Sequence, residues 1–234
     1  MDASNIGVIF DCDGTLLDSM GVWHELQYDL AKRAGGELTA DDIAALAPMS
    51  IPECGTYFHE HFGLGEDDRG VVRMIDEYML DFYRNRAEAR PGALEFARAL
   101  AEAGAHLTVA SSSPKPYLMA GMQRCGFAPL LDRVLSVEDV HSTKRQPDVW
   151  DRAREIMGTP KETTWGVEDS AYAIGTLRNA GYRTLAVYDS DDAGTWEDLQ
   201  SGAEQAVRSF EDLTAEEFLA WNEKPLFLGK AEKE

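Results

Sequence analysis

The sequence predicts an α/β protein: a doubly wound, mostly parallel sheet with an α-helical subdomain inserted after the first strand. Short apolar runs alternate with amphipathic stretches over most of the 234 residues. This alternation is typical of parallel sheets that are covered by helices on both faces. Residues 18–90 differ, because helical patterns follow one another there and no strand pattern is visible. We therefore assign residues 1–17 and 91–234 to an α/β core and residues 18–90 to the inserted helical subdomain.

The expected strands of the core are short and nearly continuous in apolar residues, as in strands that are buried on both faces. The first strand reads Ile-Gly-Val-Ile-Phe over residues 6–10 and ends abruptly at Asp11. The other strands are expected at residues 106–110, 134–136, 164–167, 184–187 and 206–210.

The expected helices are bounded by residues that start or stop helices. Pro91-Gly92 opens a helix that runs to about residue 103, and Gly104 and Gly181 follow the last turns of two core helices. The acidic run at residues 189–192 is expected to be a solvated turn. Further helices are expected at residues 119–126, 147–157, 172–180 and within 214–234 in the core, and at residues 22–34, 40–47, 54–62 and 71–86 in the insert.

Composition excludes several classes of function. The formal net charge is −20, with 42 acidic and 22 basic residues, so the surface repels nucleic acids and anionic membranes. The longest apolar runs are too short to span a membrane. The 3 cysteines and the absence of a signal-peptide pattern in residues 1–6 favour a reducing compartment. We therefore expect a cytoplasmic protein with no nucleic acid, no membrane and no obligatory protein partner.

Polar side chains follow four of the expected strands at the points where these strands end. In an open α/β sheet, ligands bind beyond the carboxyl ends of the strands, where neighbouring ends meet. Carboxylates without nearby His or Cys ligands favour a hard cation such as Mg²⁺. The set therefore predicts a magnesium site for phosphoryl transfer. Its members are Asp11 and Asp13, Ser111 and Ser113, Lys144, and Glu168 with Asp169.

The acids of this set have distinct expected roles. Asp11 can attack phosphorus and form an aspartyl-phosphate, while Asp13 protonates the leaving oxygen and then activates water. Asp11, Asp169 and the backbone carbonyl of Asp13 are the expected metal ligands, and Glu168 is expected to hold a metal-bound water.

The other residues near the strand ends also have expected roles, and for the serines a purely structural role is an alternative. Lys144 is expected to offset the charge of the phosphate. Ser111 is expected to bind the phosphate with the backbone amide of Ser112, although its hydroxyl could instead cap the following turn. Ser113 could serve in either way. Cys12 is expected to point into the core, because strand alternation turns it away from its two acidic neighbours.

Four segments, in order along the chain, resemble the motifs of the haloacid dehalogenase superfamily. Asp11-Cys12-Asp13-Gly14-Thr15 resembles the D-x-D-G-T nucleophile motif, and Ser111 at a strand end resembles the second motif. Residues 144–148, Lys-Arg-Gln-Pro-Asp, resemble the third motif, with Arg145 and Gln146 in place of the usual Pro-x. Residues 166–170, Gly-Val-Glu-Asp-Ser, resemble the fourth. The insert after the first motif is similar in position to the cap of the β-phosphoglucomutase-like phosphatases.

This resemblance implies a Rossmann-like core and a cap that closes over the site and selects the substrate. It implies that Gly14 and Thr15 belong to the phosphate-binding loop, with Thr15 bonding locally to orient it. The acid at Asp13 implies phosphate-ester chemistry, because dehalogenases and phosphonate hydrolases lack it. Trp23 and His24 lie shortly after the first motif and are the first candidates for substrate contacts of the cap, although an aromatic such as Trp23 could instead belong to the cap's own core.

The leading hypothesis is a Mg²⁺-dependent phosphatase, a phosphoric monoester hydrolase that acts on a small phosphorylated metabolite. A phosphosugar mutase would use the same aspartyl-phosphate but needs a cap cation for a second phosphate. Residues 48–53 contain no Arg or Lys, although Arg69, Arg73 or Arg84 could serve. A non-catalytic phosphate-binding protein on this fold is a remote alternative, because it would be expected to lose an acid or the lysine.

Overall fold

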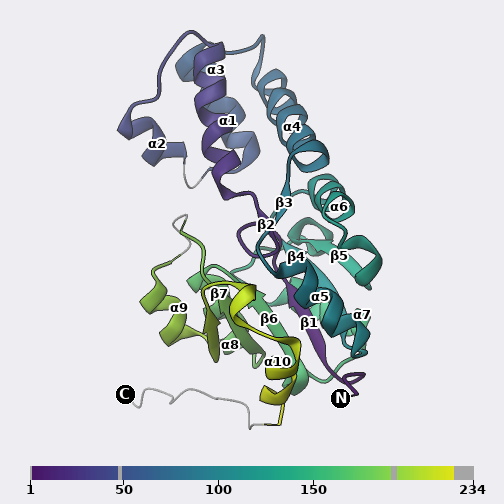
Figure 1. Ribbon diagram of the computed structural model, residues 1–234. Helices are drawn as coiled ribbons and strands as arrows, with labels where there is room; N and C mark the ends of the chain where they lie inside the picture. The colour runs from purple at the N-terminus through teal and green to yellow at the C-terminus, as the bar shows by residue number, and fades with distance from the viewer. Residues whose placement is uncertain (1, 47–48, 191–193, 224–234) are drawn as a thin grey trace. The chain divides into compact units, whose positions relative to one another are not determined.

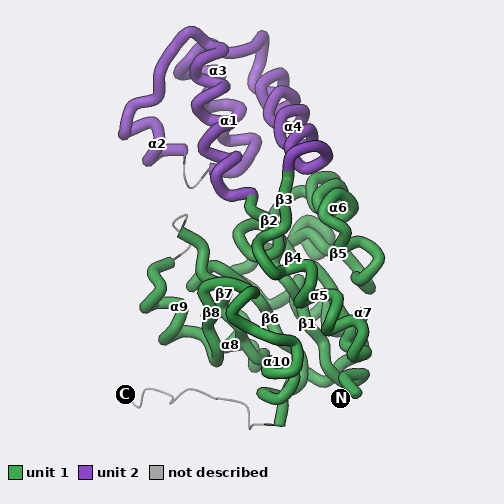
Figure 2. The backbone as a smooth tube through the Cα atoms, viewed as in Figure 1, with its two compact units in different colours: residues 1–18, 87–234 green, residues 19–86 purple. Residues whose placement is uncertain are grey.

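The computed structural model describes residues 2–46, 49–190 and 194–223. Two compact units are distinguished: unit 1 comprises residues 1–18 and 87–234, and unit 2 comprises residues 19–86 (Figure 2). Some sequence predictions concern residues outside the described ranges. These residues are positions 47–48, the acids at 191 and 192, and the charged tail from residue 224.

Unit 1 is built around a six-stranded sheet in the order β5-β4-β1-β6-β7-β8, and all its strand pairs are parallel (Figure 1). The chain starts in the middle at β1, moves outward on one side to β5, and then crosses β1 to continue outward on the other side. This reversal defines a doubly wound fold, so the predicted fold class is confirmed. The strands are β1 (Gly7–Phe10), β4 (His106–Ser111), β5 (Arg133–Ser136), β6 (Thr164–Glu168), β7 (Arg183–Val187) and β8 (Gln205–Val207).

Apolar side chains leave β1 on both faces of the sheet, so helices are packed on each face. Ile9 lies in a buried cluster with Trp150 of α7 and Leu177 of α8. Its neighbour Phe10 points to the opposite face and packs edge-on against Phe96 of α5, with ring centroids 6.4 Å apart. The helices of unit 1 are α5 (Ala93–Glu102), α6 (Lys115–Arg124), α7 (Asp148–Met157), α8 (Ala171–Asn179), α9 (Trp196–Gly202) and α10 (Ala215–Trp221).

Three elements of unit 1 differ from their expected form. Helix α6 begins at Lys115, four residues before the expected start at 119, because Pro116 lies in its first turn, where proline is well tolerated. Helix α9 was not expected; it is short and begins with a capping box between Thr195 and Asp198. Strand β8 ends at Val207, and Phe210 begins a 3₁₀ turn instead of ending a strand.

The expectation that the acidic run at 189–192 is solvated is wrong for its first residue. Asp189 is only 8 % exposed and forms an ion pair with the guanidinium of Arg90. The same guanidinium donates a hydrogen bond to the carbonyl oxygen of Tyr188 at 2.7 Å. Asp189 therefore helps to fix the segment after β3 to the end of β7.

A second, two-stranded sheet lies where the chain leaves and re-enters unit 1. Strand β2 (Leu17–Asp18) pairs antiparallel with β3 (Glu88–Ala89). The expectation that residues 18–90 contain no strand is thus wrong at both ends of that range. Strands of two residues carry no periodic pattern, so only the pairing itself reveals them.

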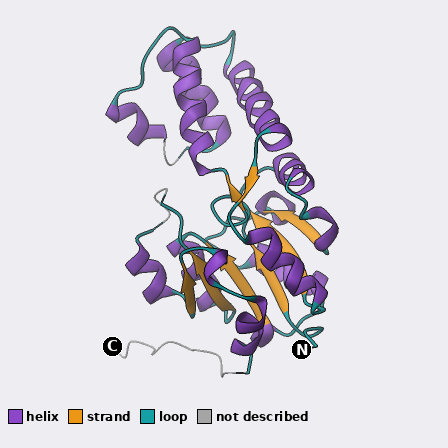
Figure 3. Ribbon diagram, in the orientation of Figure 1, coloured by secondary structure: helices purple, strands orange, loops and turns teal. Residues whose placement is uncertain are grey.

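Unit 2 consists of helices and loops in its described part (Figure 3). Helices α3 and α4 pack against each other over their apolar faces, with Phe58 and Met79 fully buried. Helix α3 begins with a capping box between Ser50 and Glu53 and ends at Gly63, which is left-handed with φ of 66°. Within the described ranges, no helix has both the length and the apolar character needed to cross a membrane. The helices are α1 (Met20–Arg33), α2 (Ala40–Leu46), α3 (Ile51–Phe62) and α4 (Asp68–Asn85).

Candidate active site

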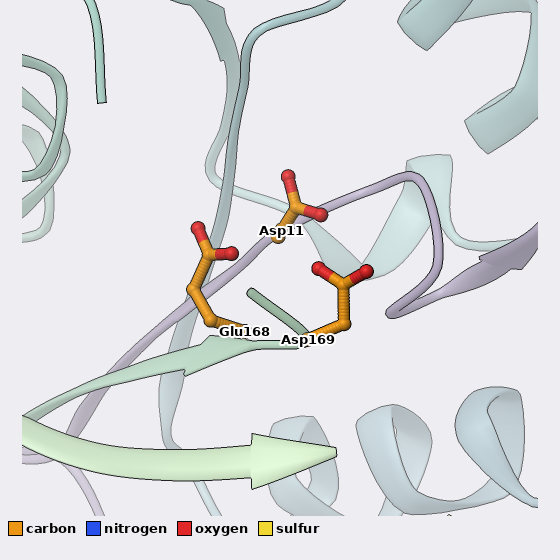
Figure 4. A group of neighbouring side chains, drawn as sticks. All are labelled: Asp11, Glu168 and Asp169. Carbon is orange, nitrogen blue, oxygen red and sulfur yellow. The ribbon is translucent and has the colours of Figure 1, made fainter. Parts of the chain in front are cut away.

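Two neighbouring strand ends at the centre of the sheet supply three acids. Phe10 of β1 is in register with Val167 of β6, and the N–H of Asp11 donates to the Val167 carbonyl at 2.9 Å. This pairing brings Asp11 beside Glu168 and Asp169, and Figure 4 shows the three carboxyl groups gathered there. One carboxylate oxygen from each residue lies within 4.8 Å of the others. All three side chains are buried, so their charges are poorly solvated.

A buried ammonium group joins these acids from a third segment of the chain. Lys144 lies between β5 and α7 and is only 4 % exposed. Its Nζ donates a hydrogen bond to Oδ1 of Asp11 and another to Oε1 of Glu168 at 2.6 Å. Burial alone would lower the pKa of Lys144, but the charges and hydrogen bonds of the two acids outweigh it and raise the pKa. Lys144 is therefore positively charged at neutral pH.

The acids of the cluster outnumber this single cation. Burial raises the pKa of Asp11, with Lys144 opposing the shift and Asp13 adding to it. Burial likewise raises the pKa of Glu168 well above its ordinary value, and that of Asp169 to about 8. Raised pKa values mean that one ammonium group does not compensate three buried carboxylates. A divalent cation would supply the missing charge, and an all-oxygen set of hard ligands suits it.

The second acid of the first motif is held by a serine from the next strand along the sheet. Ser113 lies just after β4, and its hydroxyl donates a hydrogen bond to Oδ2 of Asp13 at 2.6 Å. The backbone N–H of Ser113 donates in turn to the hydroxyl of Ser111 at 3.1 Å. Ser111 therefore does cap the following turn, while its expected contact with phosphate stays a prediction. The structure brings Asp13, Ser111 and Ser113 together at the same sheet edge.

The loop after β1 is shaped by its glycine. Gly14 has φ of 77°, a left-handed conformation that other residues adopt with strain, and the loop closes with the N–H of Leu16 bonded to the carbonyl of Cys12 at 2.9 Å. Cys12 is fully buried, as expected. The expectation that the Thr15 side chain bonds locally is wrong, because its buried hydroxyl has no hydrogen-bond partner among the described residues. The loop is instead held by its backbone.

The other expected site residues have different partners or belong to unit 2. Ser112 is exposed, and its side chain lies near Tyr172 of α8. Trp23 and His24 lie on α1 in unit 2, where Trp23 is half-buried and His24 is exposed. Their expected contact with substrate stays a prediction. Tyr172 is a neighbour of the site that sequence reasoning missed, because a surface tyrosine in a first helical turn carries no signal.

The fold and the site together define an enzyme-like α/β protein with a buried cluster of three acids and a lysine at the carboxyl edge of its sheet. A family model described as haloacid dehalogenase-like hydrolase matches residues 7–181 of the chain. The chain belongs to this family, which confirms the predicted resemblance. The predicted enzyme class is confirmed as well, because the family is one of hydrolases and several curated relatives are named as phosphatases.

Curated relatives align with most of this chain at modest identity. A pyrophosphatase named PpaX from Halalkalibacterium halodurans is 24 % identical over 194 residues, covering 77 % of this chain and 82 % of that protein. A phosphoglycolate phosphatase from Rhodobacter capsulatus is 24 % identical over 181 residues, covering 74 % and 80 %. The Arabidopsis thaliana protein SUPPRESSOR OF QUENCHING 1 is 26 % identical over 191 residues, but the match spans only 17 % of its length.

Solved structures support the fold. A haloacid dehalogenase hydrolase of family IA, variant 3, from Entamoeba histolytica superposes with a TM-score of 0.73 at 21 % identity, covering 94 % of this chain and 100 % of that one. The β-phosphoglucomutase of Clostridium difficile gives a TM-score of 0.71 at 17 % identity, covering 93 % and 96 %. At these identities the likeness shows that the fold is shared.

Proposed function

We propose that the protein is a Mg²⁺-dependent phosphatase that hydrolyses a small phosphorylated metabolite through an aspartyl-phosphate on Asp11. The observation that carries this proposal is the buried cluster in which Lys144 binds both Asp11 and Glu168 while Asp169 lies alongside. Lys144 holds one oxygen of Asp11 in place, so the carboxylate is oriented before substrate arrives. The phosphatase names of the curated relatives agree with this proposal.

The proposed reaction has two steps. In the first, a carboxylate oxygen of Asp11 bonds to phosphorus, the ester P–O bond breaks, and Asp13 gives its proton to the leaving oxygen. In the second, Asp13 takes a proton from water, the water oxygen bonds to phosphorus, and the Asp11–phosphorus link breaks to release phosphate. Ser113, which donates to Asp13 at 2.6 Å, sets the direction of that carboxyl group in both steps.

The cation has a defined place in this proposal. Asp11 and Asp169 would bind it directly together with the backbone carbonyl of Asp13, and Glu168 would hold one of its waters. When bound, a divalent cation supplies positive charge that offsets the phosphate oxygens. Lys144 adds a second positive charge to the same region, which an otherwise acidic protein needs in order to accept an anionic ester.

The division of labour between the units is part of the proposal. We assign substrate selection to the helical insert predicted at residues 18–90, with Trp23 and His24 as its first candidates. The cytoplasmic location stays a prediction; the three cysteines are all free thiols, in keeping with a reducing compartment.

Steady-state hydrolysis of p-nitrophenyl phosphate tests the function. We expect turnover with Mg²⁺, loss of activity on chelation with EDTA, and recovery on adding Mg²⁺ back. Asp11→Asn should abolish turnover and also the acid-stable phosphate label on the protein after quenching. Asp132→Asn, which alters an exposed acid bonded to His106, is the matched control and should keep wild-type turnover. Wild-type activity in Asp11→Asn would refute the nucleophile, and isomerisation of a sugar phosphate without free phosphate would replace the phosphatase by a mutase.

A further inference from the structure

An arginine and a tyrosine are stacked beside the proposed catalytic cluster within unit 1. The guanidinium carbon of Arg145 lies 5.3 Å from the centroid of the Tyr172 ring. Both side chains are exposed to solvent. Arg145 directly follows Lys144, and Tyr172 lies three residues after Asp169 in the first turn of α8. The stack is therefore formed by the two segments that deliver the buried ammonium and one of the buried acids.

Tyr172 is tied to the edge of this cluster. Its phenol group lies near the side chain of Ser112, which follows β4. Partial burial raises the pKa of Tyr172, with Lys144 opposing the shift and Glu168 adding to it, as expected for a ring close to these charges. The ring thus spans the ends of β4 and β6 and gives Arg145 a fixed surface to stack on.

Arg145 differs from the other cations on the neighbouring strand-end loops. Lys144 binds Asp11 and Glu168, Lys115 binds Asp139 at 2.8 Å, and Arg90 binds Asp189. The guanidinium of Arg145, in contrast, has no ion pair with any acid in the part of the chain that the structure describes, and its contact is the face of Tyr172. Stacking occupies the face of a guanidinium but leaves the N–H groups on its edge free to bind two oxygens at once.

We propose that Arg145, held by its stack on Tyr172, binds a second anionic group of the substrate. This inference rests on the proposed function and makes it narrower: the preferred substrate is a small phosphate monoester that carries a carboxylate or a second phosphoryl group near the ester. The second anionic group would accept hydrogen bonds from the edge N–H groups of Arg145, while the ester phosphate lies at Asp11 and Lys144.

The chemistry favours an anion over a neutral group at this position. Bidentate hydrogen bonds between guanidinium and carboxylate or phosphate are among the strongest in proteins. In a chain with a formal net charge of −20, an unpaired arginine beside the site is a local exception that draws anions toward it. The stack also reduces the freedom that Arg145 would lose on binding, so more of the interaction energy appears as affinity.

Matched substrate pairs test the inference. 2-Phosphoglycolate is compared with ethyl phosphate, and fructose 1,6-bisphosphate with fructose 6-phosphate, so that a carboxylate and a phosphoryl group are examined separately. We expect wild-type kcat/KM to favour the doubly anionic member of at least one pair. In Arg145→Gln this preference should fall by about 10- to 100-fold, the range for a lost charge-assisted hydrogen bond. Arg145→Lys should retain part of it, because lysine keeps the charge without the planar fork.

Further variants separate the stack from simple charge. Tyr172→Leu should weaken the preference, while Tyr172→Phe keeps a ring to stack on and should retain most of it. Arg152→Gln removes an exposed cation on α7 that pairs with Glu155 at 3.3 Å, and should leave the preference unchanged. The inference is overturned if Arg145→Gln lowers kcat/KM equally for both members of each pair, or if the wild type shows no preference for the doubly anionic member. In either case, measurable turnover would still support the proposed phosphatase function.

A binding measurement keeps the inference testable if no ester is hydrolysed. In that case the proposed function fails, and calorimetric titration with Mg²⁺ present compares phosphonoacetate with ethylphosphonate. Tighter binding of phosphonoacetate that is lost in Arg145→Gln would support the anion site by itself. Equal binding of the two phosphonates would remove it.

Discussion

The buried ion cluster predicts that Lys144→Met destabilises the protein far more than removal of an exposed lysine. The substitution keeps an apolar side chain of similar length but removes the ammonium that binds Asp11 and Glu168. Those two acids and Asp169 would then share a buried site without a compensating charge. Removing one partner of a buried pair costs about 3–5 kcal/mol. For a domain of this size, that corresponds to a fall in Tm of roughly 6–20 °C.

Calorimetry or circular dichroism on the metal-free protein at pH 8 measures this effect. Lys115→Met is the matched control, because Lys115 pairs with Asp139 where the two side chains are 42 % and 30 % exposed, and such pairs contribute about 0–1 kcal/mol. The deficit of Lys144→Met should shrink toward pH 5, since the acids of the cluster have raised pKa values and take up protons first. Mg²⁺ should also reduce it. If the two variants melt together at pH 8, the charge argument for the cluster is wrong.

Three further predictions concern the site and the sheet beneath it. Ser113→Ala removes the hydrogen bond to Asp13 and should lower kcat for p-nitrophenyl phosphate about fivefold, the equivalent of about 1 kcal/mol, with Tm as the control for folding. Gly166→Ala places a methyl group against Leu177 and should cost about 1–3 kcal/mol in urea unfolding; an unchanged midpoint would contradict the close packing there. In EDTA, the protonated carboxyl of Asp169 should stabilise the folded protein, because its pKa is raised from the ordinary 3.8 to about 8. This contribution is complete below pH 3.8 and is lost as the pH rises through 8. Melts from pH 5 to 9 should show this fall, and Asp169→Asn should flatten it.

The sheet could be predicted from sequence because local pattern and long-range packing agree in it. The run from Gly7 to Phe10 is apolar on both faces and sits at the centre of the sheet. For β2 and β3 there is no local pattern to agree with the packing. These two-residue strands form only because segments about 70 residues apart in the chain pair with each other. Helix α9 escaped prediction for a related reason, since seven residues are too few to establish a helical period.

The clustering of the acids and the lysine could be predicted because each lies at or after the end of a strand, and parallel strands bring their ends to one edge. Their partners could not. Ser113 and Asp13 are 100 residues apart in sequence, and Arg90 and Asp189 are 99 apart. A hydrogen bond between two polar residues leaves no trace in hydropathy or spacing. Sequence alone therefore predicts a solvated turn at Asp189, whereas the structure buries this residue against an arginine.

An acidic protein that handles phosphate esters must concentrate positive charge where the substrate binds, and the cluster explains how. Each of its acids has a raised pKa, so without a cation the site tends to retain protons. A divalent cation held by these acids would take the place of those protons and, with Lys144, would bring the formal charge of the three acids from −3 to 0. In the proposed function, the phosphate would then bind at a neutralised centre instead of an acidic one. The remaining acidic surface opposes this only weakly, because salt largely screens exposed charges beyond about 10 Å but screens buried charges much less.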